Sequence, residues 1–171
     1  MHSFAWWPTL IVMVLVSITD LRTRRIPNWV VFPYLGAGIA VSSWLQGWQG
    51  TERSLAGMGL AIVICGLFYW LGGLGAGDLK LCAAIGSWIG PQQLFIAQVV
   101  TGVVGGIWVL VWALYAGFLG ELLKGTGELA FGWAARGSFK NPEMTIDNPQ
   151  RRKLPYAPAI AIGTLLSFFA F

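Results

Sequence analysis

Long apolar stretches separated by short polar connections dominate the chain. A helix needs about 20 predominantly apolar residues to cross a bilayer. On that basis the pattern predicts about six transmembrane helices, at roughly 4–20, 29–46, 55–74, 78–91, 93–120 and 154–171. We therefore expect an all-α, polytopic integral membrane protein whose residues 1–171 form a single membrane-embedded domain.

Glycine, proline and charged residues interrupt the apolar runs. They form the connections 21–28, 47–54 and 72–77, a break at Gly90-Pro91-Gln92-Gln93, and a long segment at about 121–153. In that long segment apolar residues alternate with glycines and charges, so we expect a cytoplasmic loop with a short amphipathic helix on the membrane surface. The apolar N-terminus lacks the basic start of a signal peptide, so we expect a retained first span.

The composition is typical of an integral membrane protein. Hydrophobic residues make up 56% of the chain and charged residues only 11%, which is far from soluble usage. The two cysteines, Cys65 and Cys82, form no CxxC pair, and the only histidine is His2. We therefore expect no metal site and no cofactor. A serine mechanism is disfavoured because Ser87 has no histidine partner.

The basic residues predict the orientation of the spans. Ten of the 11 Lys and Arg residues fall on one side of the predicted spans, and only Arg53 falls on the other. Since basic loops stay in the cytoplasm, the N-terminus should lie outside the membrane and the basic loops on its cytoplasmic side. The net charge of +4 is then a topology signal and requires no nucleic-acid partner. The lipid bilayer is the partner that this pattern implies.

Two aspartates lie at the ends of apolar runs. Asp20 follows the first run, and Asp78 ends the tetrapeptide Gly75-Ala76-Gly77-Asp78. A carboxylate near the hydrocarbon is costly unless it has a use, and the predicted orientation places both at the cytoplasmic end. Two simpler explanations stay open. Asp78 could be a helix N-cap, and Asp20 could pair with Arg24 four residues on.

Two neighbouring carboxylates can share one proton, because like charges at short range cannot both ionise. One then acts as a base on a water molecule, and the other acts as an acid on a carbonyl oxygen. Asp20 lies at the C-terminal end of its predicted helix, where the helix dipole disfavours an anion, and Asp78 lies at an N-terminal end, where the dipole favours one. This asymmetry predicts that Asp20 holds the shared proton and that Asp78 is the base.

Three stretches together resemble the type IV prepilin peptidases. Residues 19–28, which contain Thr-Asp-Leu-Arg and Arg-Ile-Pro-Asn, are similar to the first aspartate motif of that family. Residues 75–81 resemble its GxGD motif, which presenilin-like proteases share, and residues 154–163 resemble its proline-containing segment at the start of the last span. The order of the stretches and the six-span layout match as well, over essentially the whole chain.

The resemblance implies an intramembrane aspartic endopeptidase with Asp20 and Asp78 as its catalytic residues. Such enzymes remove the basic leader of prepilin or pseudopilin precursors at the cytoplasmic membrane face, in pilus biogenesis and type II secretion. Larger bacterial members also carry a cysteine-tetrad zinc region and methylate the new N-terminus. This chain has no tetrad and no room for one between the first two spans, so it is similar to the short stand-alone form found with tight-adherence (Flp-type) pili.

Six further residues are candidates for binding substrate or shaping the site: Gly75, Gly77, Lys80, Pro155, Tyr156 and Pro158. The glycines would admit a substrate backbone, or serve only helix packing. The lysine would tune the aspartates, or simply extend to the membrane interface. The prolines would shape a substrate-binding strand, or merely start a helix.

Two other functions fit some of the same features. A proton-coupled transporter would use the two aspartates as a relay, but such proteins usually show internal repeats, and we find none. A non-catalytic assembly factor of a pilus or secretion machine would not need the aspartates and would tolerate their replacement by asparagine.

The predicted orientation can be tested by cysteine labelling in intact cells. Cysteines introduced near Arg24 and Lys140 should react only with reagents that reach the cytoplasm, because both sites lie in basic loops. Labelling of either site by a membrane-impermeant reagent from the outside would contradict the orientation, and with it the placement of both aspartates at the cytoplasmic end.

Overall fold

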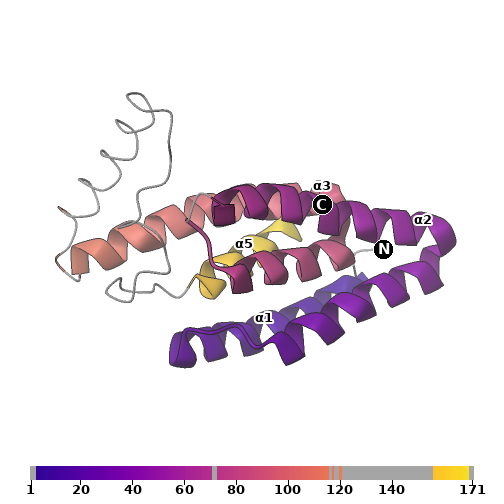
Figure 1. Ribbon diagram of the computed structural model, residues 1–171, viewed down its shortest axis with the longest axis horizontal. Coiled ribbons are helices and arrows are strands. Elements are labelled where there is room, and N and C mark those ends of the chain that lie inside the picture. Colours follow the sequence, from indigo (N-terminus) through magenta and orange to yellow (C-terminus); the bar gives the residue numbers. More distant parts are fainter. Residues whose placement is uncertain (1–2, 71–72, 116, 118–119, 121–155, 170–171) are drawn as a thin grey trace.

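The computed structural model describes residues 3–70, 73–115, 117, 120 and 156–169. Its described part is helical throughout and consists of α1 (Ser3–Thr23), α2 (Asn28–Trp70), α3 (Ala76–Tyr115) and α5 (Ala157–Ser167), which lie lengthwise in one bundle (Figure 1). The all-α prediction is confirmed. Two of the helices, α2 and α3, are long and apolar enough to cross a membrane.

The two long helices each contain one residue whose backbone is not helical. In α2 this is Gly47 (φ 60°, ψ −140°), and in α3 it is Gly90 (φ 77°, ψ 177°), which Pro91 follows. Both conformations have a positive φ that glycine adopts without steric cost. The chain turns back at these points, so α2 and α3 each form a hairpin (Figure 1). The predicted break at Gly90–Gln93 is therefore confirmed.

Several predicted boundaries were wrong by some residues. The connection expected over 47–54 is helical apart from Gly47. The chain can turn back over so few residues because Gly50, which has no side chain, packs directly on the backbone of Ser42. The last helix covers Ala157–Ser167, which is less than the span expected over 154–171. The amphipathic helix expected in 121–153 lies outside the described residues.

The connection between α1 and α2 is shorter than predicted, because α1 continues to Thr23. Arg24 then adopts a left-handed backbone conformation (φ 52°), and its amide donates to the Asp20 carbonyl at 2.8 Å. A residue in this conformation commonly ends a helix. The carbonyl of Pro27 accepts bonds from the amides of Val30 and Val31 and so starts α2.

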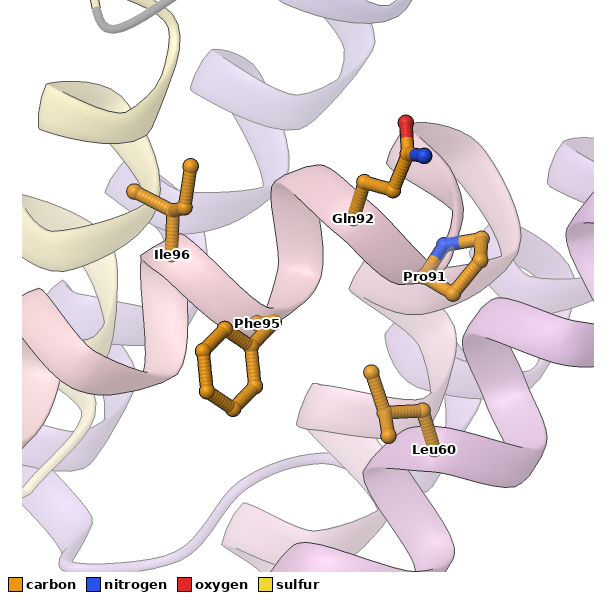
Figure 2. A pocket seen from close by; sticks show the side chains of 5 residues that line it. All are labelled: Leu60, Pro91, Gln92, Phe95 and Ile96. Carbon is orange, nitrogen blue, oxygen red and sulfur yellow. The ribbon is translucent and has the colours of Figure 1, made fainter.

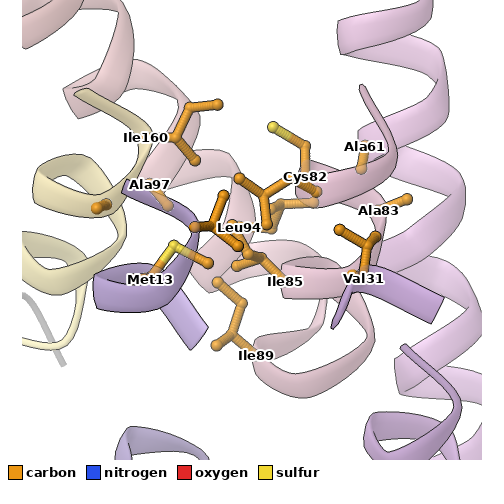
Figure 3. Close-up of a cluster of buried hydrophobic side chains, with 14 of the residues drawn as sticks. Met13, Val31, Ala61, Cys82, Ala83, Ile85, Ile89, Leu94, Ala97 and Ile160 are labelled. Atoms are coloured by element: carbon orange, nitrogen blue, oxygen red, sulfur yellow. The ribbon is translucent and has the colours of Figure 1, made fainter. Parts of the chain in front are cut away.

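The buried core lies where the helices meet around the first half of α3. Its members come from all four described helices, as Figure 3 shows with Met13 of α1, Val31 and Ala61 of α2, Ile85 of α3 and Ile160 of α5. The outward faces keep large apolar side chains exposed, among them Trp44, Val63 and Val103. An apolar exterior around an apolar core is what a bilayer, rather than water, accommodates.

Glycine brings α2 and α3 into backbone contact. A Cβ atom on Gly57 would collide with the carbonyl oxygen of Gly86, and a Cβ on Gly86 would lie 2.7 Å from the carbonyl carbon of Gly57. Beside this contact the Ser54 hydroxyl donates to the Ser87 carbonyl at 2.7 Å. The two helices are therefore held together both by close packing and by a buried hydrogen bond, as small-residue interfaces in lipid usually are.

The Gly57–Gly86 contact predicts a position-specific loss of stability. Gly57→Ala should lower the free energy of unfolding by about 1–3 kcal/mol, because the new methyl group meets backbone that cannot move aside. Gly59→Ala, two residues away, is the matched control, since nothing lies within 4 Å of its ideal Cβ. Thermal unfolding in detergent measures both, and an equal effect of the two substitutions would contradict the contact.

Candidate active site

Asp20 is a buried carboxylate in the last turns of α1. Its side chain is 6% exposed, and among the described residues it is the one charged side chain in the buried class. Its Oδ2 accepts a hydrogen bond of 3.1 Å from the backbone amide of Ala157, the first residue of α5. A carboxylate removed from water is stabilised by such a donor, so the start of α5 compensates part of the cost of burying Asp20.

Asp20 and Arg24 do not form the side-chain pair that the simpler explanation for Asp20 required. Arg24 contacts Asp20 through its backbone amide, which bonds the Asp20 carbonyl, while the carboxylate turns to Ala157. The left-handed conformation of Arg24 takes it out of the helical i+4 geometry that such a pair needs.

Asp78 lies in the first turn of α3 and is partly buried. Its Oδ2 accepts the Gly75 amide at 3.3 Å, while the Gly75 carbonyl accepts the Leu79 amide at 3.2 Å. Gly75 is therefore the residue that precedes the helix, and Asp78, three residues later, reaches back to it as in one half of a capping box. The N-cap explanation for Asp78 was wrong by three positions, although a carboxylate does serve the start of this helix.

The fold brings the two carboxylates to the same end of the bundle. Asp20 and Asp78 lie within Coulombic range of each other, although they are 58 positions apart in the sequence. Each accepts a backbone N–H at the start of a helix, Asp20 from α5 and Asp78 from the turn that opens α3. The sequence predicted that the proton is on Asp20 because only Asp78 would lie at a helix N-terminus. In the structure Asp20 also lies at one, the start of α5, so this difference between the two aspartates no longer exists.

Two contacts tie the connection after Asp20 to the turn of Asp78. A Cβ on Gly77 would lie 3.2 Å from the Cβ of Ile26, so Gly77 provides the room in which Ile26 packs. The Lys80 ammonium donates to the Asn28 side chain at 3.4 Å and lies 5.6 Å from the centre of the Phe32 ring. Lys80 thus faces α2, which favours an interfacial role over tuning of the aspartates.

The proline-containing segment opens α5, as the simpler explanation for it held. Pro158 is in the first turn of the helix, and Tyr156 is the residue before it. No strand forms between Tyr156 and Phe169. Pro155 lies outside the described residues. The sequence analysis did not predict that this segment binds Asp20. The free N–H groups that every helix start presents could have indicated a binding site for a carboxylate.

Two buried thiols lie near Asp78, and neither was a candidate site residue in the sequence analysis. Cys65 and Cys82 are free, and Gln98 of α3 donates to the Cys65 sulfur at 3.3 Å. Cys82 stands one helical turn after Asp78, on the same face of α3. Among the described residues no group of three or more His, Cys, Asp and Glu side chains is placed to hold a metal ion.

An apolar groove of about 530 Å³ lies beside the Gly90 turn inside α3. Leu60 of α2 and Pro91, Gln92, Phe95 and Ile96 of α3 line it (Figure 2). Neither aspartate lines this groove. The carboxylates, and not this groove, therefore mark the place where chemistry is possible.

The comparison with protein families agrees with this geometry. Residues 7–110, which include both aspartates, match the model of the type IV leader peptidase family. This chain belongs to that family. The resemblance inferred from the three sequence stretches is thereby confirmed at the level of the family.

Individual relatives carry the same name over a longer chain. The chain is 31% identical to the prepilin leader peptidase/N-methyltransferase of Bacillus subtilis over 91% of its own length and 51% of the relative's. It is 27% identical to the protein of that name from Burkholderia pseudomallei, over 92% and 43%. The chain thus spans about half the length of the curated relatives it matches. No solved structure matches it.

The contact between Gly75 and Asp78 predicts that a methyl group at position 75 disturbs the carboxylate. An ideal Cβ there lies 3.0 Å from Asp78 Oδ2, so Gly75→Ala should displace that oxygen from its bond with the backbone amide of residue 75 and lower the free energy of unfolding by about 1 kcal/mol. Gly73→Ala is the matched control, because its Cβ makes an ordinary 3.6 Å contact with the Phe68 carbonyl. Thermal unfolding in detergent compares the two variants, and equal stabilities would contradict the contact.

Proposed function

We propose that this chain is an intramembrane aspartic endopeptidase that removes the basic leader from type IV prepilin-like precursors at the cytoplasmic membrane face. One observation carries the proposal. Asp20 and Asp78 converge at one end of the bundle, each with one carboxylate oxygen held by a backbone amide. Membership of the type IV leader peptidase family supports the same activity.

The pair acts through one shared proton. The ionised carboxylate takes a proton from a water molecule, whose oxygen attacks the carbonyl carbon of the scissile peptide bond, and the protonated carboxyl group gives its proton to the carbonyl oxygen. The tetrahedral intermediate then collapses. The carbon–nitrogen bond breaks, the amine leaves with a proton, and the leader ends in a new carboxylate.

A backbone amide supports each of the two carboxylates in this scheme. The amides of Ala157 and Gly75 each bind one carboxylate oxygen and so fix the direction of the carboxylate. A fixed geometry matters because a displacement of about 1 Å at a reacting group can cost about 100-fold in rate. Both amides belong to backbone at helix starts, which is more rigid than a side-chain donor.

The proposed membrane arrangement has six spans, with the N-terminus outside. Gly47 and Gly90 each divide a long helix, so the four described helices contain six helical segments in all. The first segment of α3, residues 76–89, is about 21 Å long at about 1.5 Å per residue. The hydrocarbon core is about 30 Å thick. A segment this short supports a position of Asp78 below the inner surface, where a precursor would enter.

The substrate that fits such a site is a single-span prepilin or pseudopilin precursor. Its basic leader stays in the cytoplasm by the same charge rule that orients the enzyme, and its apolar helix enters the bilayer directly after the cut. Cleavage near the inner face therefore matches the cytoplasmic end at which we place the aspartates. The product would serve pilus biogenesis or type II secretion.

We further propose that the N-methyltransferase activity in the relatives' name is absent here. The 171 residues contain two cysteines, which cannot form the tetrad of the larger enzymes, and the connection between α1 and α2 holds only residues 24–27. This supports a peptidase whose 171 residues work without such a zinc region, similar to the short form found with tight-adherence pili. Incubation of a cleaved precursor with a methyl donor tests it, and methylation of the new N-terminus by the purified chain would refute it.

Replacement of each aspartate by asparagine tests the aspartic mechanism. Asp20→Asn and Asp78→Asn should each lower leader removal by about 100-fold or more, because asparagine can neither accept nor donate the transferred proton. Both variants should still insert in the membrane. Asp147→Asn, the third aspartate of the chain, is the matched control and should cleave at the wild-type rate. Cleavage near the wild-type rate by either site variant would leave the assembly-factor function as the better explanation.

A further inference from the structure

The start of α5 lacks a cap of its own. Tyr156, the residue before the helix, makes no side-chain bond to the first turn, and Pro158 has no N–H to offer. The amides of Ala159 and Ile160 bond the Tyr156 carbonyl at 3.0 and 3.2 Å. The Ala157 amide remains, and Asp20 accepts it from 137 positions away in the sequence.

Asp20 therefore serves α5 as a cap supplied by another helix. N-cap residues are preferred because their oxygen satisfies an N–H that the helix cannot, and a carboxylate also gains from the helix dipole. The relation works in both directions. Any movement of the first turn of α5 also moves the donor that directs the Asp20 carboxylate.

Tyr156 sets the position of that first turn. Its ring packs directly on Gly105 of α3. A Cβ atom on Gly105 would collide with the Tyr156 hydroxyl oxygen, and it would lie 2.7 Å from Cζ and 2.9 Å from Cε2. The ring thus occupies the space that any larger residue at position 105 would take.

The requirement for glycine is local to position 105. Gly102 and Gly106 lie within one turn of it on the same helix, yet nothing lies within 4 Å of their ideal Cβ atoms. A second close contact, between Gly163 and the Thr101 backbone, holds α5 against α3 farther along. Helix α3 carries both Gly105 and Asp78. The Tyr156–Gly105 contact therefore connects the helix of Asp78 to the segment whose Ala157 amide binds Asp20.

We propose that Tyr156 is a positioning residue for Asp20: its ring, seated on Gly105, places the Ala157 amide against the carboxylate. The inference rests on the proposed function insofar as Asp20 takes part in peptide cleavage. It assigns the proline-containing segment to the alignment of the two aspartates and not to the binding of an extended substrate. The hydroxyl group of Tyr156 takes no part in the reaction.

The first experiment compares alanine at three glycines of α3. Gly105→Ala should lower kcat by about 10-fold or more with a change in KM of less than about 2-fold, because the carboxylate is misdirected while the substrate path is untouched. Gly102→Ala and Gly106→Ala make the same chemical change in open space and should keep the wild-type kcat. An equal kcat in all three variants, or a loss at Gly105 that appears only in KM, would overturn the proposal.

A double-mutant cycle separates positioning from general damage to packing. Tyr156→Leu removes the ring, so adding Gly105→Ala in that background should cost much less kcat than it costs in the wild type. Tyr156→Phe keeps the ring and should lose less kcat than Tyr156→Leu. Independent, multiplicative effects of the two positions would refute the contact, and a loss in Tyr156→Phe as large as in Tyr156→Leu would make the hydroxyl a reacting group.

A readout without activity distinguishes this inference from the proposed function. Labelling with carbonyl-¹³C tyrosine and ¹⁵N alanine selects Tyr-Ala pairs, of which the chain has two, at 115–116 and 156–157. Tyr115→Phe identifies the Ala157 amide signal by removing the other. That signal should shift in Asp20→Asn and in Gly105→Ala but not in Gly102→Ala. An inactive wild type with these shifts would refute only the proposed function, whereas an active wild type without them would refute only the positioning.

Discussion

The burial of one carboxylate constrains much of this bundle. Asp20 is removed from solvent among apolar helices, where an ion without a donor is strongly destabilising. The start of α5 has the opposite need, since it presents an amide that no residue of its own can cap. The hydrogen bond between them meets both needs at once. The end of the chain is thereby part of the site, and α5 cannot be exchanged for any apolar helix of the same length.

Close approach of backbones allows that arrangement. Helix α3 is in contact with α1, α2 and α5, and at three of the contacts a glycine lies directly against the partner: Gly86 against α2, Gly105 against Tyr156, and Thr101 against Gly163 of α5. In a bilayer, where apolar side chains gain little by leaving lipid, contacts of this kind supply much of the packing energy. They also leave little freedom for the helices to slide, which keeps two carboxylates from different helices in a constant relation.

The family relation and the structure emphasise different parts of the chain. The family match covers residues 7–110 and includes both aspartates and the glycines around Asp78. The Ala157 amide that holds Asp20 lies beyond that match, at the start of α5. The groove beside the Gly90 turn, by contrast, does not include Asp78, and none of its lining residues carries an ionisable side chain. Chemistry and open volume are therefore separated along α3.

The sequence by itself determined the helical class and the break at Gly90, and it singled out Asp20 and Asp78 as candidate site residues. Each of these inferences depends on neighbouring residues alone: the apolar runs, the adjacent Gly-Pro pair, and a carboxylate beside an apolar run. Its local explanations of the aspartates failed. Asp78 is three positions into its helix, and Asp20 turns away from Arg24 to an amide 137 positions later. The seat of Tyr156 on Gly105 could not be inferred either, since Gly102, Gly105 and Gly106 look alike in the sequence. Only tertiary packing decides which of three glycines faces a neighbour and which helix start faces a buried charge, because both depend on how α3 and α5 are rotated against each other.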